Sequence, residues 1–138
     1  MDIVKFPQFQ LYLLTLMLFD LKEQLIPEGC DNRCINSTII NRAYFSSYLY
    51  CELWLEYVKN FRVIPIKQFG DDEEKVSEHL QVRNALFNLG EKSMELKLSK
   101  LAQLRKTADY DPFRDLTQEN VSDAIDYMEN IFNHLKFQ

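Results

Sequence analysis

The chain has 138 residues, the length of a single domain, with 16 basic and 21 acidic side chains and a net charge of −5. Its 46% hydrophobic and 27% charged residues exclude a disordered chain, a collagen-like repeat and a bare coiled coil. The acidic balance also excludes a bulk nucleic-acid coat but is compatible with a local basic surface. With 3 glycines and 4 prolines the chain has few turns, so its composition favours a helical bundle over a β-sandwich or barrel.

The first predicted helix spans residues 7–25 and contains the apolar run 11–19. A bilayer requires roughly 20 apolar residues, so this run is too short to cross one. No small-residue cleavage site follows it, and charged residues continue the helical pattern. We therefore expect a buried core helix, no membrane association and a cytoplasmic protein.

Three cysteines come next along the chain. Cys30 and Cys34 have no second pair and no histidine nearby, and Cys51 falls in an apolar segment. A structural zinc site needs four such ligands, so we expect no metal and no other cofactor. Free thiols in a reducing cytoplasm are the simplest interpretation.

The second predicted helix begins at residue 36 or 37, with Ser37 as a possible cap, and ends at residue 61. It is apolar on nearly every side, which is typical of a central helix. The third predicted helix spans residues 71–89. Four consecutive acidic residues stand at its start, the positive end of the helix dipole, and Gly90 can cap its end.

The fourth predicted helix spans residues 91–109, before Pro112, and the fifth spans residues 117–135, with Thr117 as its cap. The sequence therefore predicts one domain over residues 1–138, an all-α, up-and-down bundle of about five helices.

Basic charge is concentrated on the fourth predicted helix. Residues 91–110 carry five basic and three acidic side chains, whereas the other segments of the chain are balanced or acidic. A ligand that carries phosphate would be drawn to this helix.

Arg105 interrupts the apolar stripe of that helix, because it follows Leu98 by seven residues and Leu101 by four. A guanidinium that faces a core needs an anionic partner, since its desolvation otherwise costs several kcal/mol. One interpretation is an ion pair with Asp109, four residues further on. The other is an arginine held in a cleft for phosphate.

The third predicted helix has a similar feature. Arg83 lies on its inward stripe, and His79 lies four residues earlier, beside the same stripe. A lone histidine at such a position is more often a hydrogen-bonded structural residue than a catalyst, so both roles stay open for His79. His134, near the C-terminus, is expected at the surface.

Three segments together carry a resemblance to a known family. NRAYFSSY (residues 41–48) resembles the "N-R-A-Y-Y-A" helix of the HEPN family of small prokaryotic helical domains. HLQVR (residues 79–83) resembles its "H-x-x-V-R" pattern. LRKTADYDP (residues 104–112) is similar to the "L-R-x-x-A-D-Y-D-P" segment of one branch of the family and is the most specific match.

The resemblance implies a bundle of four or five helices and a homodimer with a cleft between the protomers. It also implies a metal-independent ribonuclease that acts as a toxin in a toxin–antitoxin or phage-defence system. The family's catalytic motif is an arginine followed, four to six residues later, by a histidine. Arg105 matches the arginine, but Tyr110 stands where R-x4-H would place the histidine.

RNA cleavage without a metal needs a base for the 2′-hydroxyl and a cation for the phosphate. We therefore expect Arg105, Tyr110 and His79 as catalytic residues and Arg83 and Asp109 as substrate-binding residues. The expected partners are RNA or a nucleotide, a second copy of the chain, and an antitoxin or nucleotidyltransferase protein. The alternative is a non-catalytic HEPN-like module that binds a nucleotide, RNA or a partner protein, so enzyme activity stays open.

Overall fold

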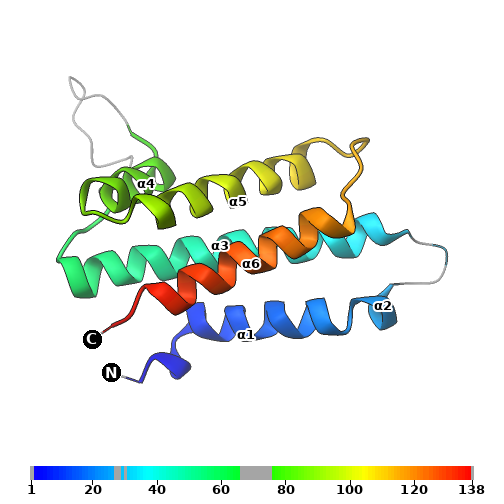
Figure 1. The fold of residues 1–138 in the computed structure, drawn as a ribbon, viewed down its shortest axis with the longest axis horizontal. Helices are drawn as coiled ribbons and strands as arrows, with labels where there is room; N and C mark the ends of the chain where they lie inside the picture. Colours follow the sequence, from blue (N-terminus) through cyan, green and yellow to red (C-terminus); the bar gives the residue numbers. More distant parts are fainter. Residues whose placement is uncertain (1, 27–28, 30, 66–75, 138) are drawn as a thin grey trace.

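The computed structural model describes residues 2–26, 29, 31–65 and 76–137. Within these ranges the chain forms a short 3₁₀ turn and six α-helices, without a β-strand, so the all-α prediction is confirmed (Figure 1). The elements are η1 (Ile3–Lys5), α1 (Pro7–Asp20), α2 (Lys22–Leu25), α3 (Asn32–Lys59), α4 (Glu78–Asn88), α5 (Lys92–Tyr110) and α6 (Gln118–His134).

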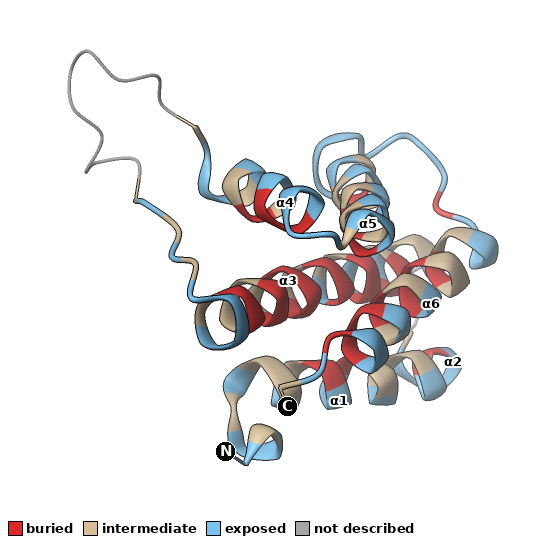
Figure 2. Ribbon diagram, turned by 60° about the vertical axis from the view of Figure 1, so that its left-hand side comes forward, coloured by how far each residue is buried: buried red, intermediate tan, exposed pale blue. Residues whose placement is uncertain are grey.

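Helix α3 is the centre of the bundle, as predicted. It packs against α1, α4, α5 and α6, and residues such as Ile39, Ala43 and Leu55 are completely buried in it. Figure 2 shows buried residues along most of its length, with α1 on one side of α3 and α4 and α5 on the other. The surface between α3, α4 and α5 is therefore remote from α1.

The start of α3 differs from the prediction at residue 36 or 37. The helix begins at Asn32, because the carboxylate of Asp31 accepts a hydrogen bond of 3.0 Å from the backbone N–H of Arg33. Aspartate is among the best N-cap residues. Asp31 precedes Ser37 by six residues, so the helix begins more than one turn before the predicted start.

The predicted helix 7–25 is two helices, which raises the count from five to six. The backbone of Leu21 leaves the α-helical region, with φ −102° and ψ 7°, and α2 begins after it. Neither proline nor glycine marks this break. Lys22 is buried beyond it, and its Nζ donates a hydrogen bond of 2.8 Å to Asn36 Oδ1 on α3.

Helix α4 is shorter than the predicted 71–89. It begins at Glu78, where the hydroxyl of Ser77 caps it by accepting a hydrogen bond from the backbone N–H of Leu80. The four acidic residues predicted for its first turn, 71–74, lie outside the described residues. Gly90 follows α4 with φ +90°, a conformation that favours glycine, so the predicted end is confirmed.

The last two helices agree closely with the prediction. Thr117 caps α6 as expected, and Asn120 completes a reciprocal capping box with it. In the described part of the chain, no helix has the length and apolar character needed to span a membrane.

Candidate functional site

A cleft of about 310 Å³ opens where α3, α4 and α5 meet. We call it the α4–α5 cleft. Two arginines, a lysine and a histidine contribute to its wall, which consists of Tyr44, Ser77, His79, Arg83, Ser99, Ala102, Gln103, Arg105 and Lys106. Three residues predicted for a site from sequence, His79, Arg83 and Arg105, therefore come together in one cleft.

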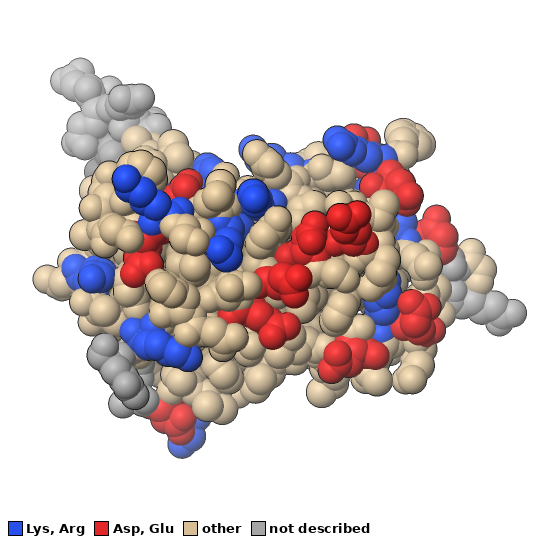
Figure 3. Space-filling model, viewed as in Figure 1, with Lys and Arg blue, Asp and Glu red and all other residues tan. Residues whose placement is uncertain are grey.

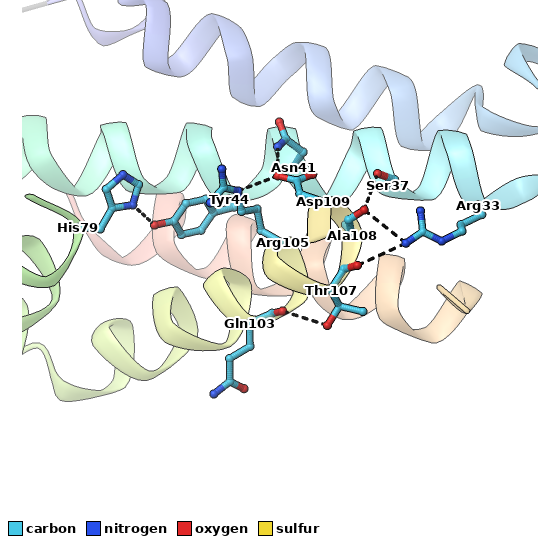
Figure 4. A network of polar contacts seen from close by, with 10 residues as sticks. All are labelled: Arg33, Ser37, Asn41, Tyr44, His79, Gln103, Arg105, Thr107, Ala108 and Asp109. Atoms are coloured by element: carbon cyan, nitrogen blue, oxygen red, sulfur yellow. Dashed lines mark hydrogen bonds and ion pairs between the residues drawn. The ribbon is translucent and has the colours of Figure 1, made fainter. Parts of the chain in front are cut away.

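Arg105 is largely enclosed in the cleft. Its Nε lies 2.8 Å from Asp109 Oδ2 and only 23% of its side chain is exposed. That Nε is buried and its N–H finds no aligned hydrogen-bond acceptor, so the contact with Asp109 is an ion pair without a well-formed hydrogen bond. Asn41 of α3 donates a hydrogen bond of 3.0 Å to the same carboxylate oxygen (Figure 4).

Aromatic rings surround the guanidinium of Arg105. The ring centres of Phe45, Tyr110 and Tyr44 lie 5.2, 5.4 and 5.9 Å from its central carbon. Cation–π contacts of this kind attract the guanidinium and restrict its rotamers. The arginine is thus held in place by α3 and by its own helix. Arg105 pairs with Asp109, as the first interpretation from sequence predicted, and it also lines the cleft.

His79 is held by two tyrosines of α3. Its ring stacks on Tyr48 with centres 4.0 Å apart and an interplanar angle of 6°. Its Nδ1 forms a hydrogen bond with the hydroxyl of Tyr44 (Figure 4). Burial and, next, the positive charge of Arg105 lower the pKa of His79 below its usual 6.5, so the imidazole is neutral at pH 7.

Tyr44 remains a protonated hydroxyl beside this histidine, because burial raises its pKa above the usual 10. When Nδ1–H of His79 donates to the Tyr44 oxygen, Nε2 keeps its lone pair and can accept a proton. In this tautomer the pair can supply a base to a ligand in the cleft, whereas a Tyr44 hydroxyl that donates to Nδ1 leaves the proton on Nε2.

The remaining cations are less constrained. Arg83 donates a hydrogen bond of 3.4 Å from Nη1 to Ser99 Oγ. Among the described residues, neither Arg83 nor Lys106 forms an ion pair. Both side chains have donors for an anion in the cleft.

Tyr110 and Asp109 lie beside Arg105 and not on the wall of the cleft. Tyr110 is the last residue of α5 and 71% exposed. Its phenol contacts Arg105 through the ring face, so its position fits support of the guanidinium.

Arg33 holds the end of the helix that carries these residues. Its guanidinium donates to the carbonyl oxygens of Asp111 at 2.7 Å and Arg114 at 3.0 Å, and to those of Thr107 and Ala108 at 3.3 Å. Thr107 and Ala108 belong to the last turn of α5 (Figure 4). Asp111 and Arg114 follow that helix, and a cation at its end also interacts favourably with the helix dipole.

Sequence analysis missed three residues of the site: Tyr44, Asn41 and Lys106. Tyr44 and Asn41 lie within the motif at 41–48, in a predicted helix that is apolar on nearly every side, and the resemblance gave neither residue a role. Lys106 is the neighbour of Arg105, and the basic charge of α5 was the available signal for it. Across the described ranges, no group of three or more His, Cys, Asp or Glu side chains is arranged to hold a metal ion.

Comparison of this chain with protein-family models, with curated proteins and with solved structures finds no match.

Proposed function

We propose that the α4–α5 cleft binds a phosphate of RNA and cleaves the RNA backbone without a metal ion. The observation that carries the proposal is the meeting of three cationic side chains with one neutral histidine. Arg83, Arg105 and Lys106 supply the positive charge, and His79 supplies a base. Preorganised cations beside a phosphate stabilise the charge that develops in the transition state.

The reaction is an intramolecular transfer. His79 Nε2 takes the proton of a ribose 2′-hydroxyl, and the 2′-oxygen attacks the adjacent phosphorus. The bond from phosphorus to the 5′-oxygen breaks, and the leaving oxygen takes a proton from water. The products are a 2′,3′-cyclic phosphate and a free 5′-hydroxyl. Arg105 stabilises the phosphate, Arg83 binds it, and Asp109 and Tyr110 orient Arg105.

The biological role follows from the resemblance to the HEPN family. It favours a toxin of a toxin–antitoxin or phage-defence system, controlled by an antitoxin or nucleotidyltransferase partner. A cytoplasmic location belongs to the same proposal, and the unbonded thiols of Cys34 and Cys51 are compatible with it.

A second candidate is a non-catalytic module that binds the phosphate of RNA or of a nucleotide. The observation that favours it is the internal pairing of Arg105 with Asp109, which Asn41 reinforces. An arginine neutralised in this way is suited to recognition, and Tyr110 replaces the histidine of the family's motif.

The test uses the purified chain, a 5′-labelled single-stranded RNA of mixed sequence, and buffer with EDTA. We expect cleavage that Arg105→Ala reduces by about 10²–10³-fold and His79→Gln by about 10²-fold or more. Two matched controls, Arg62→Ala and His134→Gln, remove an exposed arginine and the other histidine, neither of which lines the cleft.

The outcomes separate the two candidates. Binding without cleavage, weakened by Arg105→Ala but not by Arg62→Ala, would support the non-catalytic module and contradict the ribonuclease. Cleavage that persists in folded Arg105→Ala and His79→Gln variants would show that another site is responsible. If the wild type neither binds nor cleaves RNA, both candidates are wrong.

A further inference from the structure

A cavity with aromatic walls lies between η1, the start of α1, the second half of α3 and the end of α6. Figure 1 shows the start of α1 and the end of α6 at the same end of the bundle. The volume of the cavity is about 660 Å³, within the range of small-molecule sites. We call it the aromatic cavity, after the five rings that line it: Phe9, Tyr12, Tyr50, Phe132 and Phe137. It shares no lining residue with the α4–α5 cleft, and α3 separates α1 from α4 and α5 (Figure 2).

The rings of the aromatic cavity hold one another in place. Phe132 stacks on both Tyr12 and Tyr50, with ring centres 4.2 and 4.0 Å apart. Phe9 meets Phe132, and Phe137 meets Tyr50, through steeply inclined contacts at 6.0 and 5.5 Å. The three stacked side chains are at most 9% exposed. The walls are therefore formed before a ligand enters, which reduces the entropic cost of binding.

Two hydrogen bonds hold the segment that follows α6 beside the cavity. The hydroxyl of Tyr50 donates to the carbonyl oxygen of Leu135 at 2.6 Å, and the indole N–H of Trp54 donates to that of Lys136 at 2.9 Å. The side chains of Lys136 and Phe137 both line the cavity. The backbone that carries them is thus anchored to α3.

Three hydrogen-bond donors accompany the rings: the ammonium of Lys136, the side-chain amide of Asn133 and the hydroxyl of Tyr12. Among the residues that the structure describes, none of these three side chains forms a hydrogen bond or an ion pair. Burial and, next, the charge of Glu129 raise the pKa of Tyr12 above its usual 10, so the hydroxyl stays protonated. Glu129 itself does not line the cavity. The cavity therefore presents several donors and the positive charge of one lysine.

We propose that the aromatic cavity binds a small planar aromatic carboxylate, whose ring contacts the aromatic walls and whose carboxylate pairs with Lys136. Rings form stacked and edge-to-face contacts with other rings, which favours an aromatic ligand over an aliphatic one of the same size. One ammonium balances the single charge of a carboxylate, whereas a phosphate monoester carries about two negative charges. A cationic ligand would be repelled by Lys136. This proposal is independent of RNA binding in the α4–α5 cleft.

The first test is titration calorimetry of the full chain with three matched probes. We expect 2-naphthoate to bind with a Kd on the order of 0.1 mM. The alcohol 2-naphthylmethanol keeps the rings but lacks the charge, and it should bind about fivefold more weakly. Decahydro-2-naphthoate keeps the charge but has saturated rings, and it should also bind about fivefold more weakly.

The second test locates the bound acid. Lys136→Met removes the ammonium and keeps an unbranched side chain, so it should weaken 2-naphthoate about fivefold and leave the alcohol unchanged. Asn133→Trp fills the cavity from an exposed position without altering the buried rings, and it should abolish binding of both probes. The matched controls are Lys92→Met on α5 and Asn84→Trp on α4, at exposed positions that line neither the aromatic cavity nor the α4–α5 cleft. Circular dichroism checks that each variant is folded.

The proposal is wrong if 2-naphthoate does not bind at millimolar concentrations, or if the saturated acid binds as tightly. It is equally wrong if folded Lys136→Met and Asn133→Trp variants bind 2-naphthoate like the wild type. Arg105→Ala separates the two sites, because it should leave the affinity for 2-naphthoate unchanged. A loss of affinity in Arg105→Ala would place the acid in the α4–α5 cleft, contrary to the proposal.

Discussion

At the scale of single residues, the guanidinium of Arg105 has two effects on the cleft. Together with burial it lowers the pKa of His79, which keeps the imidazole neutral, and in the proposed reaction it supplies positive charge to the phosphate that the 2′-oxygen attacks. Asp109 limits the second effect, because its carboxylate lies 2.8 Å from Arg105 Nε. In the proposed complex, the affinity for phosphate would therefore depend on the balance between the carboxylate and the cations.

Asp109→Asn tests that balance. The amide keeps the size of the side chain but removes a negative charge near the bound phosphate. At a separation of several ångströms in a partly hydrated cleft, such repulsion amounts to about 1 kcal/mol. We expect about fivefold tighter binding of single-stranded RNA, measured by fluorescence anisotropy. Weaker binding by a correctly folded variant would mean that Asp109 mainly positions Arg105.

The lowered pKa of His79 predicts how the free energy of unfolding changes with pH. Its pKa in the folded protein is lowered, so below pH 6.5 the unfolded chain binds a proton that the folded chain does not. This histidine therefore reduces stability as the pH falls through 6.5 toward its folded pKa, and its effect is absent above pH 6.5. Urea unfolding at pH 7.5 and 5.5 should show a larger acid-induced loss for the wild type than for His79→Gln. An equal loss in both proteins would contradict the lowered pKa.

At the scale of elements, local signals predicted the helices where one residue dominates. Thr117 starts α6 and Gly90 follows α4, because capping and positive φ are local properties of the chain. The start of α3 was missed because Asp31 caps the helix ahead of Ser37, and α4 begins after Ser77, which the sequence analysis did not consider as a cap. The break at Leu21 has no local signal, and it accompanies a tertiary contact between Lys22 and Asn36.

The site was predicted only in part for a similar reason. His79, Arg83 and Arg105 are out of place on apolar stripes, which periodicity reveals. The contacts of Tyr44 with His79 and of Asn41 with Asp109 join residues more than thirty positions apart. Contacts of that kind depend on how the helices pack, and the local patterns of a single sequence do not reveal that packing.

The contacts of Arg33 predict how strongly α3 stabilises the end of α5. Its guanidinium bonds four carbonyls at the end of α5, and hydrogen bonds from a charged donor contribute more than neutral ones. We expect Arg33→Ala to lower the free energy of unfolding by about 2 kcal/mol, as measured by urea unfolding. The control is Arg62→Ala, which removes only an exposed ion pair with Glu56 and should cost less than about 1 kcal/mol. If Arg33→Ala and Arg62→Ala lower the free energy of unfolding equally, the contacts of Arg33 with the end of α5 do not stabilise the fold more than an exposed ion pair does.

At the scale of the whole molecule, charge is divided between neighbouring helices. Helix α6 contains four acidic residues, Glu119, Asp123, Asp126 and Glu129, and neither lysine nor arginine. Figure 3 shows a line of acidic side chains over α6 and basic side chains over α4 and α5. The acidic surface repels a polyanion that extends beyond the cleft. RNA contacts should therefore be confined to the cations of the cleft.

The salt dependence of RNA binding measures that confinement. Each phosphate neutralised on single-stranded nucleic acid contributes about −0.7 to the slope of log K against log salt, so three cations predict a slope of about −2. Arg105→Ala should reduce the slope to about −1.4, whereas Arg62→Ala, whose arginine lies outside the cleft, should leave it unchanged. A slope of about −5 or steeper would require contacts well beyond Arg83, Arg105 and Lys106. A slope near zero would mean that these cations do not bind phosphate. Neutralising a phosphate releases counterions, and because added salt opposes that release, binding through phosphate must weaken as the salt concentration rises.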